Sequence, residues 1–391
     1  MKSKITSKKN ACLLIGVCFV ITLVQCSKSE FMEKEYDPVV PLFDYSSVAC
    51  IARITDNSEN WSLCRMEASG NDFQKIVELT VSCQKPVCSH SGTQLVFTAT
   101  QWNSWFDEYN AFQINAQYGL YVTNINGTGY KLIEHIDDKN DGRFGCVAWS
   151  PDDKQIIYVR SYDSHLNKNY LILYNIPDNT ETIIPTEGNV CNLSFSPDGK
   201  QIVYCTTIET DGMVYIHSFY NHHIYKMDAN GKNNQLIIQN AGSPKWSPHG
   251  DKIVYLTIGK NGSSQIAVAD ADGSNQKQLT SSVSPNWLDT GFPRGGNSDP
   301  QWTPDGKRIV YVSEENDNTE IFIMNVDGRK KTRLTKAAYG DDSPEITPDG
   351  KHILFHSRKS ALMVGGINIM ELDGSNQQVI SNVGIYPIAC R

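Results

Sequence analysis

A ten-residue segment that recurs along the chain predicts an all-β fold, a β-propeller of four-stranded antiparallel blades. Two full copies, Trp149–Tyr158 and Phe195–Tyr204, share a hydrophobic residue, a Ser-Pro-Asp turn and a run of β-branched residues; others begin at Trp246, Trp302 and Ile346, and a degraded copy at Cys88. The six copies start 44 to 61 residues apart, which suits one blade per repeat. The composition agrees, because 28 Gly, 18 Tyr and 7 Trp are typical of antiparallel sheets with many turns.

Each copy has the pattern of a hairpin. A hydrophobic residue ends one strand, a tight turn follows, and a β-branched run begins the next strand. A second motif, an alternating strand that ends in a polar turn, follows at 120–127, 171–178, 224–231, 266–273, 321–328 and 367–374. A short strand such as Thr332–Thr335 then completes the blade.

The two ends of the chain complete the count. The N-terminal segment from Ser47 to Thr80 has the pattern of a blade without its innermost strand, and Pro387 near the C-terminus aligns with Pro244, Pro300 and Pro344. We therefore predict that the C-terminal strand pairs into the N-terminal blade, which closes a ring of seven blades and removes two unpaired edges. The alternative is a six-bladed ring with the N-terminal hairpin outside it. Closure would place Cys50 and Cys390 on neighbouring strands, where we expect a possible disulfide.

The order of the motifs resembles a known family. Trp-Ser-Pro-Asp-Gly-Lys-x-Ile-Val-Tyr, then Ile-x-Ile-Met-x-x-Asp-Gly, then Arg-Leu-Thr is similar to the blade pattern of TolB-like propellers, over about residues 44 to 391. Similar blades occur in the propellers of prolyl oligopeptidase relatives and of the tricorn protease. The resemblance implies a fold and leaves the function open.

The N-terminus has the pattern of a bacterial lipoprotein signal. Four lysines precede the apolar stretch Ala11–Val24, and Leu23-Val24-Gln25-Cys26 looks like a lipobox. We predict a signal peptide at 1–25, lipidation of Cys26, a tether at 26–43 and the propeller at 44–391, with plain secretion and an uncleaved anchor as alternatives. The lipid would be the only membrane contact, and the protein would be exported to the outer membrane, on its periplasmic or its cell-surface side.

Charge and cysteine content limit the partners. The net charge is −8, and removal of residues 1–25 with their four lysines makes it −12, which disfavours nucleic acid. Eight of the eleven cysteines remain after Cys26, and they contain no Cys-x-x-Cys pair. The sequence is compatible with either disulfides or buried free thiols for these eight cysteines.

Long insertions fall in the loops of one predicted face, and variable loops on a constant scaffold usually carry function. They begin with the loop from Gln101 to Tyr118 and are rich in aromatic residues, which suit recognition of protein, peptide or sugar rings. The candidate binding face comprises Trp102, Trp105, Phe106, Tyr109, Tyr215, His217, Tyr220, His222, His223, Trp287, Phe292 and Arg294. About half of these aromatics are expected to pack their own loops instead. We predict no metal site, because the adjacent His222 and His223 would face opposite ways on a strand, and we interpret Asp341 and Asp342 as a solvated turn.

The sequence contains no Gly-x-Ser-x-Gly elbow, Walker loop or dinucleotide fingerprint. We therefore predict a non-catalytic scaffold without a cofactor that binds a protein, peptide or glycan of the cell envelope. The alternative is a polysaccharide lyase or another glycan-acting enzyme that uses the same loop face. A third hypothesis is a TolB-like role together with a peptidoglycan-associated lipoprotein.

Overall fold

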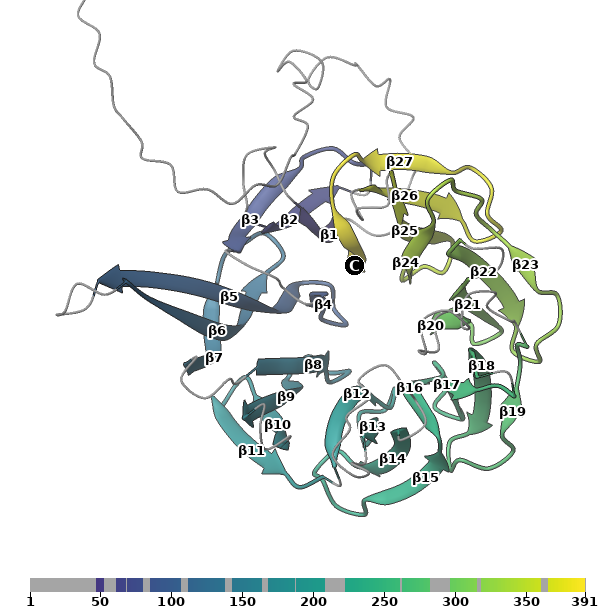
Figure 1. Cartoon of the computed structure of the whole chain (residues 1–391), viewed down its shortest axis with the longest axis horizontal. Helices are drawn as coiled ribbons and strands as arrows, with labels where there is room; N and C mark the ends of the chain where they lie inside the picture. Colours follow the sequence, from purple (N-terminus) through teal and green to yellow (C-terminus); the bar gives the residue numbers. More distant parts are fainter. Residues whose placement is uncertain are drawn as a thin grey trace, which may run out of the picture. The chain divides into compact units, whose positions relative to one another are not determined.

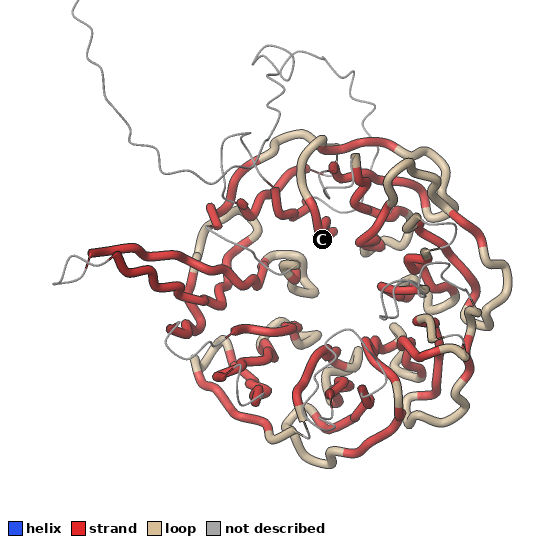
Figure 2. The backbone as a smooth tube through the Cα atoms, in the orientation of Figure 1, coloured by secondary structure: helices blue, strands red, loops and turns tan. Residues whose placement is uncertain are grey.

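The computed structural model describes residues 47–52, 61–67, 69–79, 85–106, 112–137, 143–163, 168–186, 188–207, 222–260, 262–281, 296–314, 318–359 and 365–390. All of them belong to one compact unit, Pro41–Arg391. Within that unit, seven four-stranded sheets follow one another around a ring, and the described residues form strands, turns and loops (Figures 1 and 2). The predicted seven-bladed all-β propeller is confirmed.

Each blade is an antiparallel sheet whose strands follow one another outwards from the centre of the ring (Figure 1). Blade 1 contains β28 (Ile385–Cys390), β1 (Ser47–Ala52), β2 (Trp61–Glu67) and β3 (Gln74–Leu79). Blade 2 contains β4 (Val87–Cys88), β5 (Gln94–Phe106), β6 (Phe112–Asn124) and β7 (Lys131–Asp137). Blade 3 contains β8 (Arg143–Trp149), β9 (Gln155–Asp163), β10 (Lys168–Asn175) and β11 (Thr180–Ile184).

The remaining four blades repeat this order. Blade 4 contains β12 (Asn189–Phe195), β13 (Gln201–Thr207), β14 (His222–Asp228) and β15 (Gln235–Gln239). Blade 5 contains β16 (Ala241–Trp246), β17 (Lys252–Ile258), β18 (Ser264–Asp270) and β19 (Lys277–Gln278). Blade 6 contains β20 (Asn297–Trp302), β21 (Arg308–Ser313), β22 (Glu320–Asn325) and β23 (Thr332–Arg333). Blade 7 contains β24 (Asp341–Ile346), β25 (His352–Arg358), β26 (Gly365–Glu371) and β27 (Gln378–Ser381).

The C-terminal strand closes the ring, as the sequence predicts. β28 pairs antiparallel with β1, so that Cys390 lies opposite Ser47 and Ile388 lies opposite Ala49. The C-terminal end of the chain thereby pairs with the edge of β1 that would otherwise be open.

The predicted disulfide between Cys50 and Cys390 is wrong. Side chains alternate along a strand, so Cys390 shares a face with Ala49, whereas Cys50 points to the other face of the blade. Cys390 is instead joined to Cys88 of β4, with 6.1 Å between their Cα atoms. Cys50 is a buried free thiol directly opposite Cys64.

The repeated turn is held by its own side chains. In blade 4 the Ser196 hydroxyl donates to Asp198 Oδ1 at 2.7 Å and accepts from the Gln201 amide at 2.9 Å. The hydrogen bond from Ser196 lowers the pKa of Asp198. Gly199 follows with φ of +69°, a backbone conformation that glycine adopts without strain. The fourth turn position therefore favours glycine, although blade 3 has Asp153 there with φ of 58°.

Four innermost strands share a bulge immediately before a proline. Ser243, Asp299, Ser343 and Tyr386 have φ between 47° and 53° and each precedes Pro244, Pro300, Pro344 or Pro387. The pairing register of β16, β20 and β24 shifts at this point. Since a bulge re-aims the side chains beside it, this feature determines which residues after the proline face the axis.

The tryptophans that end the innermost strands connect neighbouring blades. Trp149 Nε1 donates to the carbonyl of Val87 at 3.0 Å, and Trp302 Nε1 donates to the carbonyl of Lys245 at 3.2 Å. Trp246 occupies the same position in blade 5, but its buried Nε1 has no hydrogen-bond partner among the described residues. The repeat therefore uses one residue type both to fill the core and to hold blades together.

The hydrophobic core lies between blades, in seven clusters that each draw on two neighbours. Between blades 6 and 7, for example, Ile321 and Ile323 pack with Ile353 and Phe355, all of them at most 6% exposed. Both faces of the middle strands are thus buried, which accounts for the continuous apolar runs in the repeats.

One predicted loop is a pair of strands. The segment from Gln101 to Tyr118 lengthens β5 and β6, which stay paired from Gln94 opposite Asn124 to Phe106 opposite Phe112. Figure 1 shows this hairpin reaching outwards from the ring. No helix in the described part of the chain is long and apolar enough to span a bilayer.

Candidate binding cavity

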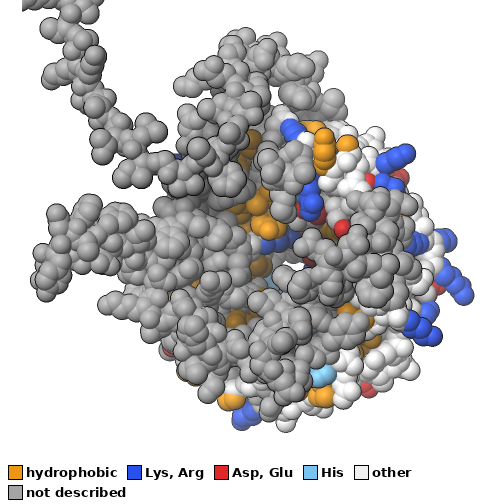
Figure 3. Space-filling model, viewed as in Figure 1, with side chains coloured by type: hydrophobic (Ala, Val, Ile, Leu, Met, Phe, Trp, Pro, Cys, Tyr) orange, Lys and Arg blue, Asp and Glu red, His pale blue; other side chains and the backbone are white. Residues whose placement is uncertain are grey.

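The innermost strands surround a cavity of about 520 Å³ at the centre of the ring. Six of them contribute the residue that follows the proline or its equivalent: Val87, Ala148, Ser194, Lys245, Glu345 and Ile388. Figure 3 shows a hollow at this point, bordered by orange hydrophobic atoms and blue atoms of Lys or Arg. The volume lies within the range of about 300 to 1,000 Å³ that is usual for ligand pockets.

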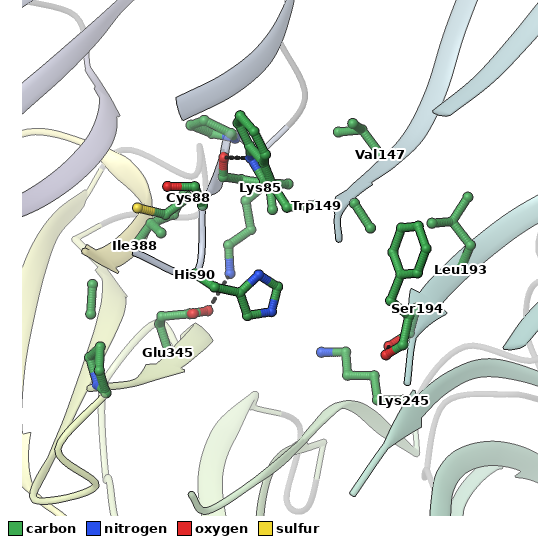
Figure 4. Close-up of a pocket in the computed structure, with 17 residues that line it drawn as sticks. Lys85, Cys88, His90, Val147, Trp149, Leu193, Ser194, Lys245, Glu345 and Ile388 are labelled. Carbon is green, nitrogen blue, oxygen red and sulfur yellow. Dashed lines mark hydrogen bonds and ion pairs between the residues drawn. The ribbon is translucent and has the colours of Figure 1, made fainter. Parts of the chain in front are cut away.

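Apolar and charged side chains alternate around the cavity (Figure 4). The apolar ones come from β8, β12 and β28 and include Val147, Ala148, Leu193, Phe195, Ile388 and Ala389. Lys85 and Glu345 lie near Ile388, and Lys245 lies near Ser194 (Figure 4). A ligand with an apolar body and one charged group would match this mixed lining.

Lys85 and Glu345 form an ion pair on one side of the cavity, with 2.8 Å between Nζ and Oε2 (Figure 4). The two side chains are 36% and 25% exposed, so solvent screens the pair only in part. Gln301 Nε2 also donates to Glu345 Oε2 at 3.4 Å. Both contacts are made by the same carboxylate oxygen of Glu345.

Lys245 differs from Lys85, because no hydrogen bond or ion pair joins its amine to another described residue (Figure 4). The half-buried side chain points into the open space of the cavity. Burial lowers the pKa of Lys245, and the positive charge of Lys85 acts in the same direction, while Asp299 and Glu345 oppose it. An anionic group that entered the cavity would find this amine available.

Comparison with known proteins identifies the family. The family model described as the TolB beta propeller domain matches residues 43–291 and 289–390, which together include all of the described residues. The chain belongs to the TolB β-propeller domain family.

Individual relatives of this TolB-type propeller match it less completely. The chain is 34% identical over 86 residues to the Tol-Pal system protein TolB of Thioalkalivibrio sulfidiphilus, which covers 21% of the chain and 17% of that protein. It is 27% identical over 209 residues to an uncharacterized protein of Agrobacterium fabrum, which covers 51% of the chain and 60% of that protein. The chain thus matches less than two thirds of the length of either relative.

Among solved structures, an oligogalacturonate lyase from Vibrio parahaemolyticus is similar, with a TM-score of 0.55 and 12% identity over 86% of each chain. At this identity the similarity shows the propeller fold alone.

Most of the sequence-predicted binding face lies outside the described residues: Tyr109, Tyr215, His217, Tyr220, Trp287, Phe292 and Arg294. The lipidation candidate Cys26 also lies outside them. Trp102, Trp105 and Phe106 are on β5, within the extended hairpin of the TolB-type propeller. Their role in binding stays a prediction.

The two adjacent histidines are in β14 and differ in environment. His222 is buried, which lowers its pKa, and the charge of His223 acts in the same direction. His223 is half-buried, and its Nδ1 accepts a hydrogen bond from the Asn240 amide at 3.1 Å.

The interpretation of Asp341 and Asp342 as a solvated turn is wrong. Asp341 is 3% exposed, and burial raises its pKa. Burial alone would also raise the pKa of Asp342, but His356 and Arg358 lower it on balance, and Arg358 Nη2 lies 2.6 Å from its carboxylate. Both acids therefore form part of the buried structure at the start of β24.

The cavity residues Lys85, Lys245 and Glu345 were not singled out from the sequence. A signal was present, because Lys245 and Glu345 hold the same position after the proline of the repeat, where blades 2 to 4 have Val, Ala and Ser. Comparing this position across the repeats would have found both residues.

Proposed function

We propose that this chain is an exported lipoprotein, attached to the outer membrane through Cys26, whose propeller is a non-catalytic scaffold. It binds a protein or peptide of the cell envelope, and a carboxylate of that partner enters the axial cavity. The observation that carries the proposal is that no described residue pairs with the amine of Lys245, which lies in a cavity with a largely apolar lining. The family match and a relative named as a Tol-Pal system protein support an envelope setting.

The chemistry favours a carboxylate with an adjoining apolar group. The chain as a whole has a net charge of −8, so its long-range field repels anions, and the cavity provides a local exception. A hydrogen bond between charged partners contributes about 1.5 to 3 kcal/mol when it is well formed. The apolar residues that line the cavity add affinity for an apolar group next to the carboxylate.

The aromatic residues predicted as a binding face form the second part of the proposal. Trp102 and Trp105 belong to the long hairpin of β5 and β6, and in this proposal they contact a partner larger than the cavity. Amphipathic rings of this kind suit protein surfaces and also glycans. A glycan partner is therefore the alternative that the experiment must distinguish.

The test is capture of partners from solubilised envelope, followed by affinity measurement with each purified partner. Lys245→Met should weaken binding at least about tenfold, which corresponds to the loss of about 1.4 kcal/mol. Lys232→Met is the matched control, because Lys232 is exposed in the polar turn between β14 and β15. Equal affinity of the wild type and Lys245→Met would refute the role of the cavity.

Two further measurements separate the remaining alternatives. If the Trp102→Ala, Trp105→Ala double variant loses binding and Lys245→Met does not, the binding site is on the hairpin and not in the cavity. Incubation with a panel of pectic and host glycans addresses catalysis. New unsaturated or reducing ends would overturn the non-catalytic assignment and favour the lyase alternative.

A further inference from the structure

Three strands of blade 4 bring two cysteines and a histidine together. These residues are too far apart in sequence to form a recognisable motif. Cys191 is on β12, Cys205 on β13 and His222 on β14, and their candidate ligand atoms all lie within 4.8 Å of one another. Cys205 and His222 are buried and Cys191 is half-buried. Among the described residues, this is the group of sulfur and nitrogen ligands that meets the spacing of a metal site.

The register of the strands explains the meeting. His222 lies opposite Thr207, two residues beyond Cys205, so His222 and Cys205 share one face of the sheet. On the other side, the pairing of β12 with β13 shifts between Val190 and Asn192, and Cys191 is the extra residue of this bulge. The bulge turns Cys191 towards Cys205, since a bulged residue leaves the regular alternation.

Cys191 and Cys205 are joined as a disulfide, with 5.7 Å between their Cα atoms. The group therefore has an oxidised form in which the sulfurs bind each other. Asn192 Nδ2 lies 3.9 Å from Cys205 Sγ and is placed to donate to that sulfur. A donor beside the sulfur stabilises the negative charge that a thiolate would carry.

We propose that blade 4 carries a redox-gated binding site for Zn²⁺, closed by the disulfide and opened by its reduction. The disulfide takes two electrons and two protons from a dithiol reductant, which itself becomes a disulfide, and two thiols result. Zn²⁺ then displaces the two thiol protons to solvent and is held by two thiolates and the imidazole of His222. Three protein ligands leave one tetrahedral position open.

The geometry suits this ion. Tetrahedral Zn²⁺ has Zn–S and Zn–N bonds of about 2.3 and 2.1 Å, so its ligand atoms are about 3.5 to 3.8 Å apart. The candidate ligand atoms of the three side chains lie within 4.8 Å of one another, which is compatible with this spacing. Two sulfurs and one imidazole favour a borderline-soft ion over Mg²⁺ or Ca²⁺, which require oxygen ligands. The site lies in the core shared by blades 4 and 5, away from the residues that line the axial cavity, so it is independent of the proposed binding function.

The test uses the full chain without a His tag, in parallel oxidised and reduced preparations. The reduced chain should bind one Zn²⁺ per molecule in competition with a chromophoric chelator, and Co²⁺ in its place should give thiolate-to-metal charge-transfer absorption. The oxidised chain should bind none. Equal binding by both preparations would overturn the proposal, as would the absence of binding by the reduced chain.

Variants identify the ligands. Cys191→Ser, Cys205→Ser and His222→Gln should each weaken binding by more than the about 10- to 100-fold that follows loss of an outer-shell partner. His223→Gln is the matched control for the histidine, and the double variant Cys50→Ala, Cys64→Ala is the control for the other buried thiols. Retained affinity in His222→Gln, or its loss in either control, refutes the ligand set.

A second measurement does not depend on whether the variants fold. In the reduced wild type, Zn²⁺ should slow alkylation of Cys191 and Cys205, identified by peptide mass, while Cys146 reacts at its unchanged rate. Equal alkylation of Cys191 and Cys205 with and without Zn²⁺ would overturn the proposal.

Discussion

Replacing Cys88 with serine removes the covalent link between the innermost strands of blades 1 and 2. Cys390 is the last residue of β28, so the disulfide fastens the C-terminal strand to the blade beyond the one that it completes. Without this link, β28 is held at its end by pairing with β1 and by the apolar contacts of Ile388 and its neighbours. We expect Cys88→Ser to destabilise the ring and to let β28 fray first.

The magnitude follows from the separation of the two cysteines, which is 302 residues. The chain-entropy relation gives about 5.7 kcal/mol at 25 °C for a loop of this length, and measured disulfides usually contribute about 2 to 4 kcal/mol. Native contacts that persist in the unfolded state reduce the effect. We therefore expect a loss of about 3 kcal/mol in the free energy of unfolding.

The assay is guanidinium unfolding of oxidised wild type, Cys88→Ser, Cys390→Ser and the double variant, without reductant. The three variants should have the same lowered midpoint, because each removes the same link. Cys146→Ser is the control, since Cys146 is a free thiol. A midpoint for Cys88→Ser equal to that of Cys146→Ser, or a peptide map that links Cys390 to Cys50, would refute the reasoning.

Three other outcomes are expected from the repeats themselves. Trp149→Phe should cost about 1 kcal/mol more than the matched change Trp246→Phe, because, of these two tryptophans, only Trp149 donates a hydrogen bond, to the carbonyl of Val87; equal costs in thermal unfolding would contradict this. Gly199→Ala should cost about 1 to 2 kcal/mol, since φ is +69° there, and a stabilised variant in urea unfolding would show that the turn relaxes. The hydrogen bond from Ser196 lowers the pKa of Asp198, so its stabilising contribution is complete above its unfolded pKa of about 3.9 and is lost as pH falls through the folded value. Asp341, whose pKa burial raises, acts in the opposite sense and at higher pH, since it favours folding as the pH falls from its folded value to about 4. The urea midpoint should decrease as the pH falls below about 4, and a midpoint that rises there would contradict the contribution of the turns.

Much of the fold follows from local sequence, and the candidate site does not. The repeat turn is formed by residues close together in sequence, as in Ser196 to Gln201, so local sequence specifies the hairpin. The repeat number and the match of Pro387 to the other blades then imply closure at seven. By contrast, the aromatic binding face was predicted from the length of the insertions. Part of the first insertion is not a loop but continues β5 and β6 as paired strands.

The sequence by itself determined the hairpins, their number and the closing strand, because these depend on turn chemistry and on a repeat that can be counted. Only the tertiary structure decided which side chains meet. Whether Cys390 bonds to Cys50 or to Cys88 depends on which face of its blade each side chain points to, and Cys88 is 302 residues away in sequence. Whether the amine of Lys245 has a partner depends on the residues that other blades bring to the cavity. Cys191, Cys205 and His222 meet because of a single bulge in β12. A shift of one residue moves a side chain to the other face of a blade, and no local pattern records that choice.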